Sequence, residues 1–268
     1  RAMAVLKFEA RRQSYPQRYW SRLLSGWLKN ATPRRSVLLA QVLTKLPAEV
    51  LIAVRYELSQ WLGNHYEELE QSDRHVAQGC FDQVLAALKG GGTEVMHSGL
   101  GKSSVGGVEI PSNRMGVDYA INAPTGDLAQ GIINAVFARK PKRNQGLPVD
   151  LRLRMERLLA LPEEGGWHAL TVIAQQLHAL YEIDPQWTRT ALLPRFDPLD
   201  SVAEAAWSGF LQASRLARPA LDREMMAHFL AAIASTPRRH ADGLAQRGQH
   251  LVLALEGSHK SQPLVTSD

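Results

Sequence analysis

Apolar residues recur every three to four positions along most of this chain, the spacing that places them on one face of an α-helix. Residues 167–183 give the clearest case, because Leu170, Ile173, Leu177 and Leu180 fall on a single face. The same spacing predicts further helices over residues 16–27, 37–46, 47–70, 73–88, 125–139, 148–158, 202–213, 219–233 and 252–255.

Prolines and one aspartate mark where several of these helices begin. Pro16, Pro47, Pro148 and Pro219 stand where a first-turn proline belongs, since a proline there sacrifices no helical hydrogen bond. Asp73 precedes an apolar stripe that includes Cys80, and we expect its carboxylate to cap that helix. Elements of this length joined by short turns are typical of stacked antiparallel helix pairs.

Residues 90–116 interrupt the helical pattern. They contain eight glycines, and their apolar residues have no helical period. Residues 93–96 and 108–110 could form a short hairpin. Loops longer than about 15 residues are uncommon in compact domains and tend to be functional or disordered. We therefore interpret this segment as an insertion or hinge between two helical halves.

These patterns predict an all-α protein, an irregular antiparallel helical-repeat (HEAT-like) array with a glycine-rich loop insertion. No strict repeat is visible in the letters. The predicted regions are an N-terminal helical region, the insertion, a C-terminal helical region and a polar tail, at residues 1–89, 90–117, 118–256 and 257–268.

The composition is that of a globular, water-soluble protein. The 268 residues are 45% hydrophobic and 21% charged, and no run approaches the ~20 apolar residues that span a bilayer. Cys80 is the single cysteine, which excludes an internal disulfide and fits a reducing compartment, so we expect a cytoplasmic protein without a membrane partner. The chain begins Arg-Ala-Met, which suggests that it is part of a longer protein.

The net charge of +5 is unevenly distributed. Residues 1–35 carry a charge of +8, residues 139–157 carry +5, and the remainder sums to −8. Two basic patches on an acidic body could attract nucleic acid, an acidic protein surface or a second copy of the chain. The simpler alternative is that these side chains form solvated helix faces and loops.

The sequence contains no complete motif for catalysis or cofactor binding. The stretch SGLGKSS at residues 98–104 resembles a phosphate-binding loop, but the required first glycine falls on Met96 and no helix can readily follow. The histidines have no metal-ligand spacing, and we expect His168 and His178 to pack with hydrogen-bonded rings. We expect no cofactor, no metal and no catalytic residue in this chain.

The stretch DYAINAPTGDLAQGIINAVFARKPKR, residues 118–143, is the most informative. Pro124 forces a turn before the helix, Thr125 or Asp127 can cap it, and Gly126 allows close approach of a neighbouring helix. Polar groups at the helix start and basic groups after its end could instead present a binding site. The candidate binding residues are Asn122, Thr125, Gly126, Asp127, Arg139, Lys140, Lys142 and Arg143.

Two runs resemble a known family. DYAINAPTGDLAQGIINAVF and AEAAWSGFLQASRLARPAL, which begin at Asp118 and Ala203, are similar to recurring runs in the C-terminal helical regions of sirtuin-like, NAD-hydrolysing bacterial antiphage proteins. The likeness covers residues 113–235. The positions that match the pattern are Asn122, Pro124, Gly126, Trp207, Gly209 and Phe210. The resemblance implies a sensing or scaffolding region, with NAD cleavage in a missing segment or a separate subunit.

The sequence thus predicts a non-catalytic region of an antiviral defence protein that binds a phage protein, another defence protein or a second copy of itself. One alternative is a helical-repeat nucleic-acid binder that uses Arg11, Arg12, Arg18, Arg22 and residues 139–143 on phosphates. Another is an unfamiliar enzyme, which would need a concave pocket that gathers two or more titratable residues.

Overall fold

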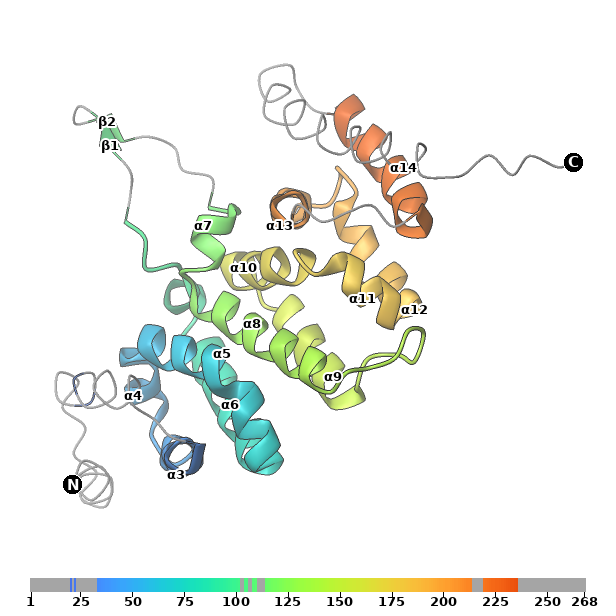
Figure 1. The fold of residues 1–268 in the computed structure, drawn as a ribbon. Coiled ribbons are helices and arrows are strands. Elements are labelled where there is room, and N and C mark those ends of the chain that lie inside the picture. The colour runs from blue at the N-terminus through green and yellow to red at the C-terminus, as the bar shows by residue number, and fades with distance from the viewer. Residues whose placement is uncertain are drawn as a thin grey trace, which may run out of the picture. The chain divides into compact units, whose positions relative to one another are not determined.

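The computed structural model describes residues 20, 22, 33–101, 104–105, 108–109, 114–213 and 219–235 (Figure 1). The described residues divide into two compact units. The first comprises those up to Pro141 together with residues 147–173, and the second comprises residues 142–146 and those from Ala174 onward. Apart from one pair of two-residue strands, the described elements are helices, which confirms the predicted all-α class. The helical-repeat character stays a prediction.

The first unit contains most of the elements. In chain order they are α3 (Pro33–Leu43), α4 (Ala48–Ala53), α5 (Arg55–Ser72), α6 (Arg74–Gly90), the 3-10 helix η1 (Thr93–Met96), β1 (Ser104–Val105), β2 (Val108–Glu109), α7 (Val117–Ala120), α8 (Pro124–Ala138), α9 (Val149–Leu159) and α10 (Glu163–Ala174), the last as far as Ile173.

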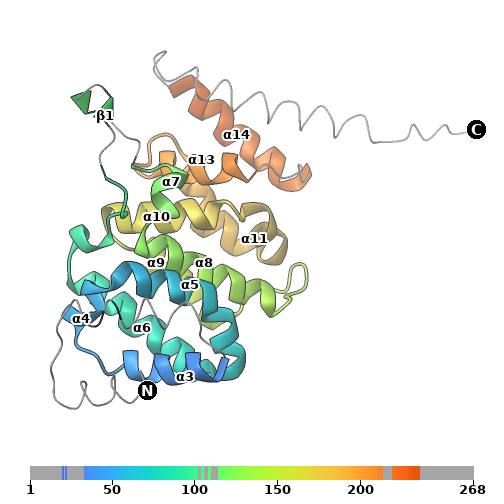
Figure 2. The same cartoon turned by 60° about the vertical axis from the view of Figure 1, so that its left-hand side comes forward.

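Helix α5 is central to the first unit. It packs most extensively against α8 and also contacts α3, α4 and α6, as both Figure 1 and Figure 2 show. Glycines permit the close approach of α5 and α8, because a Cβ added at Gly131 would lie 3.1 Å from the Cα of Gly63. Around this contact Tyr66 and Phe81 are buried, with their rings edge to face at 5.7 Å.

The glycine-rich segment does not separate two halves. Helices α5 and α8, on either side of it, belong to the same unit, and the division of the chain falls near Ile173 instead. The predicted strand at residues 93–96 is wrong, because Thr93–Met96 forms η1. The second strand, Val108–Glu109, pairs antiparallel with Ser104–Val105. Met96, at the end of η1, is buried.

Most predicted helix boundaries hold. The Asp73 carboxylate accepts a hydrogen bond from the Val76 amide at 3.1 Å, as expected of a cap, and Cys80 is buried. Two predicted helices are each divided in two. Val54 separates α4 from α5, and the turn ending at Gln176 separates α10 from α11 (Leu177–Ile183). The apolar stripe continues across each break because both pieces bury the same face, so periodicity did not reveal the break.

The second unit continues with α11, α12 (Pro185–Trp187), the π-helix η2 (Thr188–Leu192), the 3-10 helix η3 (Leu193–Phe196), α13 (Ala203–Gln212) and α14 (Pro219–Ser235). Its core is aromatic. Trp207 donates from Nε1 to the Phe196 carbonyl at 3.1 Å, and the Phe196 and Phe210 rings pack edge to face. The Trp-x-Gly-Phe run is therefore a packing element in this chain.

Predicted features at the chain ends fall outside the described residues. These are most of the helix over residues 16–27, the helix over residues 252–255 and the polar tail. Within the described part of the chain, no helix has both the length and the apolarity to cross a membrane.

Candidate functional site

The candidate residues of the sequence do not form a single site. Asn122 and Asp127 lie at the start of α8, whereas Arg139 follows its last residue. Fifteen helical residues at 1.5 Å each separate the two groups by about 20 Å. Lys142 and Arg143 belong to the second compact unit. The two ends of α8 are therefore distinct places and are described in turn.

Residues at the start of α8 are mostly packed inside. Thr125 is buried, and the helix has no side-chain cap, so the expected cap from Thr125 or Asp127 is wrong. Close approach at Gly126 is confirmed, because a Cβ there would lie 1.9 Å from the Ala120 carbonyl oxygen. Asn122 alone is exposed, and its side-chain amide donates to the Asp118 carbonyl at 2.8 Å.

Asp127 is a half-buried carboxyl group that is hydrogen-bonded to a serine. The Ser59 hydroxyl lies 3.1 Å from Oδ2 of Asp127 and 3.2 Å from the Tyr56 carbonyl. A serine hydroxyl has one proton, so Ser59 donates to only one of these two oxygens at a time. Burial raises the pKa of Asp127 to about 7, and the Ser59 hydrogen bond only partly offsets this.

The end of α8 has the opposite electrostatics. Arg139 donates to Oδ1 of Asp150 at 2.7 Å and, through Nε, to Oε2 of Glu70 at 3.2 Å. Its hydrogen bond with Arg139 lowers the pKa of Asp150, and the pKa of Arg139 is raised by the same contact and by Glu70. The guanidinium thus ties α8 to α5 and α9.

The basic block around Arg139 is largely neutralised within the fold. Arg154 and Arg157 both pair with Asp82 of α6, and Arg152 lies 3.7 Å from Glu156. Lys140, Lys142 and Arg143 form no ion pair with the acidic side chains of the described residues. Four arginines of the block, Arg139 included, are therefore paired with acids, and the solvated alternative fits the two lysines and Arg143.

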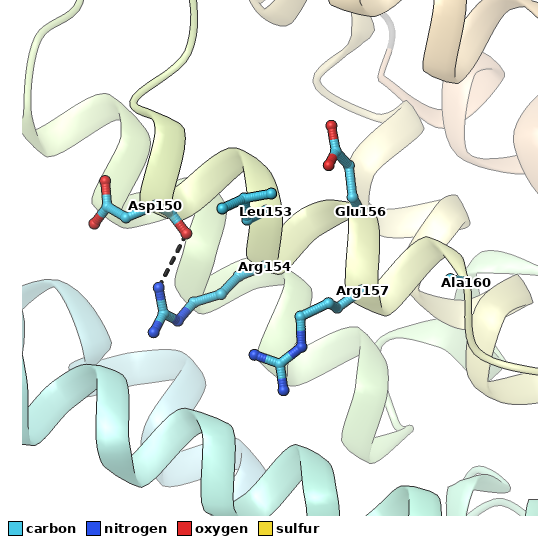
Figure 3. A pocket seen from close by; sticks show the side chains of 6 residues that line it. All are labelled: Asp150, Leu153, Arg154, Glu156, Arg157 and Ala160. Atoms are coloured by element: carbon cyan, nitrogen blue, oxygen red, sulfur yellow. Dashed lines mark hydrogen bonds between the residues drawn. The ribbon is translucent and has the colours of Figure 1, made fainter.

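A pocket of about 460 Å³ lies along the outer side of α9 (Figure 3). Its lining residues are Asp150, Leu153, Arg154, Glu156, Arg157 and Ala160. Four of these are titratable, which is the feature that an enzyme would need. However, Asp150 has a lowered pKa and both pocket arginines are ion-paired, whereas proton transfer at neutral pH needs a group that titrates near pH 7. The geometry suits binding better than proton transfer.

A second polar cluster, which the sequence did not reveal as a unit, lies where the glycine-rich segment leaves and rejoins the helices. Glu164 of α10 is buried and accepts from Arg114 at 2.7 and 3.0 Å. Its Oε1 lies 3.7 Å from Nε2 of His97. His97 and Arg114 lie toward the two ends of the glycine-rich segment, residues 90–116, so one carboxylate contacts both parts. We call these three residues the Glu164 clamp.

His168 supports the Glu164 clamp from one helical turn further along α10. Its Nε2 lies 3.1 Å from the Arg114 carbonyl, so the neutral ring donates there. The ring is buried, and burial lowers the pKa of His168 to about 4. The predicted role as a hydrogen-bonded packing histidine is confirmed. His178, in the second unit, stacks on Phe210 with ring centroids 5.3 Å apart, which also fits a packing role.

Two exposed apolar side chains lie beside the Glu164 clamp. The Gly99 amide donates to the Asn122 carbonyl at 3.0 Å, which places the backbones of Leu100 and Ile121 next to each other. Leu100 is 41% exposed and Ile121 is 53% exposed. We call Leu100, Ile121 and Asn122 the base surface. Of the candidate binding residues, Asn122 alone belongs to it.

Three comparisons, with protein-family models, with curated proteins and with solved structures, find no match for this chain. The membership of a sirtuin-like defence family therefore stays a prediction from the two sequence runs. Among the residues that the structure describes, no group of three or more His, Cys, Asp or Glu side chains is placed to hold a metal ion.

Proposed function

We propose that this chain is a non-catalytic helical binding protein and that the base surface recognises a protein partner. The observation that carries the proposal is the Gly99–Asn122 backbone hydrogen bond, which brings together the two chain segments that carry exposed Leu100, Ile121 and Asn122. Aliphatic side chains beside a polar group are typical of protein–protein interfaces.

The Glu164 clamp supports this proposal. Loops that bind partners are generally held on a rigid scaffold, because an ordered surface loses less conformational entropy on binding. Here a buried carboxylate engages residues from both ends of the glycine-rich segment. The Tyr56 hydroxyl adds a hydrogen bond to the His97 carbonyl at 3.2 Å, on the same side of the segment as Gly99. The base surface is thereby fixed from several helices.

The partner that fits is a protein that offers an aliphatic side chain and backbone groups. Leu100 and Ile121 supply the apolar contact, and Asn122 can exchange hydrogen bonds at its edge. Phosphate recognition is less well supported, because Arg139, the first cation of the proposed phosphate-binding block, is held by Glu70 and Asp150.

The more specific role follows from the sequence resemblance. It makes this chain the sensing or scaffolding part of a bacterial antiviral defence system, with a phage protein or a defence protein as partner. Catalysis, in that case an NAD hydrolysis, belongs to another segment or subunit. Cells that carry the coding region with its neighbours should then lower the plating efficiency of a phage, and Ile121→Asp should remove this protection.

The proposal is tested by comparing proteins captured by the purified chain and by two variants. Ile121→Asp alters the base surface, and Leu199→Asp places the same charge at a side chain that is 92% exposed in the second unit. We expect a protein that binds the wild type and Leu199→Asp equally and Ile121→Asp at least about tenfold less, since a buried charge opposes apolar contact.

Two results would overturn the proposal. One is a set of captured proteins that does not distinguish Ile121→Asp from the wild type. The other is a nucleic acid as the bound molecule, with an affinity that falls steeply with salt and does not depend on Ile121. That second result would establish the nucleic-acid alternative.

A further inference from the structure

The outer face of α9 exposes apolar side chains away from the base surface. Val149 is 60% exposed and Leu153 is 50% exposed, while Leu151, Met155 and Leu158 of the same helix are buried. Val149, Leu153 and Ala160 recur at intervals of four and seven residues, so they share one side of the helix. Figure 3 shows Glu156 pointing away from the side to which Arg154 and Arg157 extend.

The charges on this face balance each other. Arg152 and Glu156 are 3.7 Å apart, and their side chains are both about two-fifths exposed (36% and 42%). Arg157, at the edge of the pocket, is paired with Asp82 of α6. A face with equal and opposite charges around an apolar centre does not select a strongly charged ligand, but it can be complementary to itself.

We propose that this face binds the same face of a second copy of the chain, with the two α9 helices antiparallel. We place the two-fold axis perpendicular to the helix, at the level of residue 154. Each residue then lies opposite the residue of the second copy whose number, added to its own, gives 308. Arg152 then faces Glu156 of the second copy, and the symmetry repeats this pair. At 1.5 Å of helical rise per residue, the two Leu153 positions are offset by about 3 Å along the helix axis. Val149 and Ala160 of the second copy are offset by about 1.5 Å along the same direction.

In this pairing, the apolar residues, the exposed charges and the pocket of the α9 face all contribute to the interface. The apolar residues meet at the centre and toward both ends, the exposed charges form two pairs, and the 460 Å³ pocket beside Leu153 can receive Leu153 of the second copy. One 11-residue helix offers less area than a standard interface, so we expect a weak dimer with a dissociation constant of roughly 10 to 100 µM.

Charge exchange tests this arrangement in the full chain. Arg152→Glu creates two Glu–Glu contacts across the axis, and Glu156→Arg creates two Arg–Arg contacts. The double variant Arg152→Glu/Glu156→Arg restores two opposite-charge pairs across the axis and also keeps the pair within each helix. We expect each single variant to weaken association by at least about fivefold and the double variant to recover it.

Sedimentation velocity from about 1 to about 300 µM protein brackets the expected association. Thermal unfolding of each variant shows whether it is folded, and Leu153→Ser, which removes apolar contact without adding charge, should also weaken the dimer. A chain that is monomeric throughout would overturn the proposal, as would a dimer that neither single variant weakens, or a double variant that does not recover. Loss of the dimer in Ile121→Asp but not in Arg152→Glu would place self-association at the base surface instead and would equally overturn it.

Discussion

The two ends of α8 handle buried charge in opposite ways. At the start of the helix, Asp127 is half-buried beside the neutral hydroxyl of Ser59, and desolvation raises its pKa to about 7. After the last helical residue, Arg139 lies between Glu70 and Asp150, and the pKa of Asp150 is lowered. A carboxyl group paired with a cation stays ionised, whereas the one beside a serine tends toward its neutral form.

This difference shows which influence on the pKa of Asp127 is larger at the start of α8. A helix N-terminus favours a carboxylate by about 0.3 to 1 kcal/mol at exposed positions. Asp127 is in the first turn and benefits from this field, yet its pKa still rises. Desolvation of Asp127 therefore outweighs the Ser59 hydrogen bond, which favours the ionised carboxylate. The sequence pattern "acidic residue in the first turn" is the same in either case, so it did not distinguish an exposed cap from a buried acid.

The largest effect is expected from Gly126→Ala. The new Cβ would lie 1.9 Å from the Ala120 carbonyl, and backbone must move to relieve the overlap. We expect a loss of about 3 kcal/mol or more in the free energy of unfolding, measured by urea denaturation. Gly79→Ala in α6 is the matched control, because its nearest atom is 3.9 Å away and alanine favours a helix by about 1 kcal/mol. A Gly126→Ala protein as stable as the wild type would show that this contact is loose.

Removal of the cation at the other end of α8 comes next. Arg139→Met leaves Glu70 and Asp150 without their common partner, and we expect the free energy of unfolding to fall by about 2 kcal/mol, less than for a fully buried pair because the guanidinium is partly exposed. Lys140→Met removes an adjacent charge that is exposed and unpaired, so it should change stability by less than about 0.5 kcal/mol. Equal effects of the two variants in urea denaturation would contradict the structural role of Arg139.

A smaller, pH-dependent effect is expected from Asp127→Asn. A raised pKa means that the folded state binds this proton more tightly than the unfolded chain, so the stability from protonation is complete below about pH 3.8 and is lost as the pH rises to about 7. Asparagine has no proton to lose. The variant should therefore gain on the wild type as the pH rises from 4 to 7.5, by up to about 1.4 kcal/mol for each pH unit.

The comparison of wild type with Asp127→Asn is needed because His168 has the opposite pH dependence. Its lowered pKa gives stability that is complete above about pH 6.5 and is lost as the pH falls to about 4. In the wild type, the stability contributions of Asp127 and His168 change with pH in opposite directions between pH 4 and pH 6.5. The difference in the free energy of unfolding between the wild type and Asp127→Asn isolates the contribution of Asp127. A difference that does not change with pH would mean that Asp127 is ionised throughout.

The sequence predicted local features well. Apolar spacing identified α6, α8, α9, α13 and α14, and the capping role of Asp73 and the close approach at Gly126 followed from residue chemistry. These features depend on neighbours within a few positions. The π-helix Thr188–Leu192 lies in a stretch without a clear pattern and was not predicted.

Pairings between distant residues could not be predicted. Glu70 is 69 positions from Arg139, and Glu164 is 50 positions from Arg114. A single sequence does not indicate that such residues pair, because the local pattern shows each of them only as a charged residue at a helix end. Interpreting Arg139 as an available cation was reasonable on local grounds, and the tertiary fold gave it acidic partners.

The most direct test of the proposed base surface measures amide hydrogen exchange at Gly99 and its neighbours in the full chain. Glu164→Gln removes the charge of the Glu164 clamp, and Glu163→Gln makes the same change at an exposed side chain one residue earlier. If the clamp fixes the surface, exchange of the Gly99 amide, which donates to Asn122, should accelerate at least about tenfold in Glu164→Gln and stay unchanged in Glu163→Gln, while exchange in α5 remains slow. Equal exchange at Gly99 in the wild type and both variants would contradict the clamp and the recognition surface that depends on it.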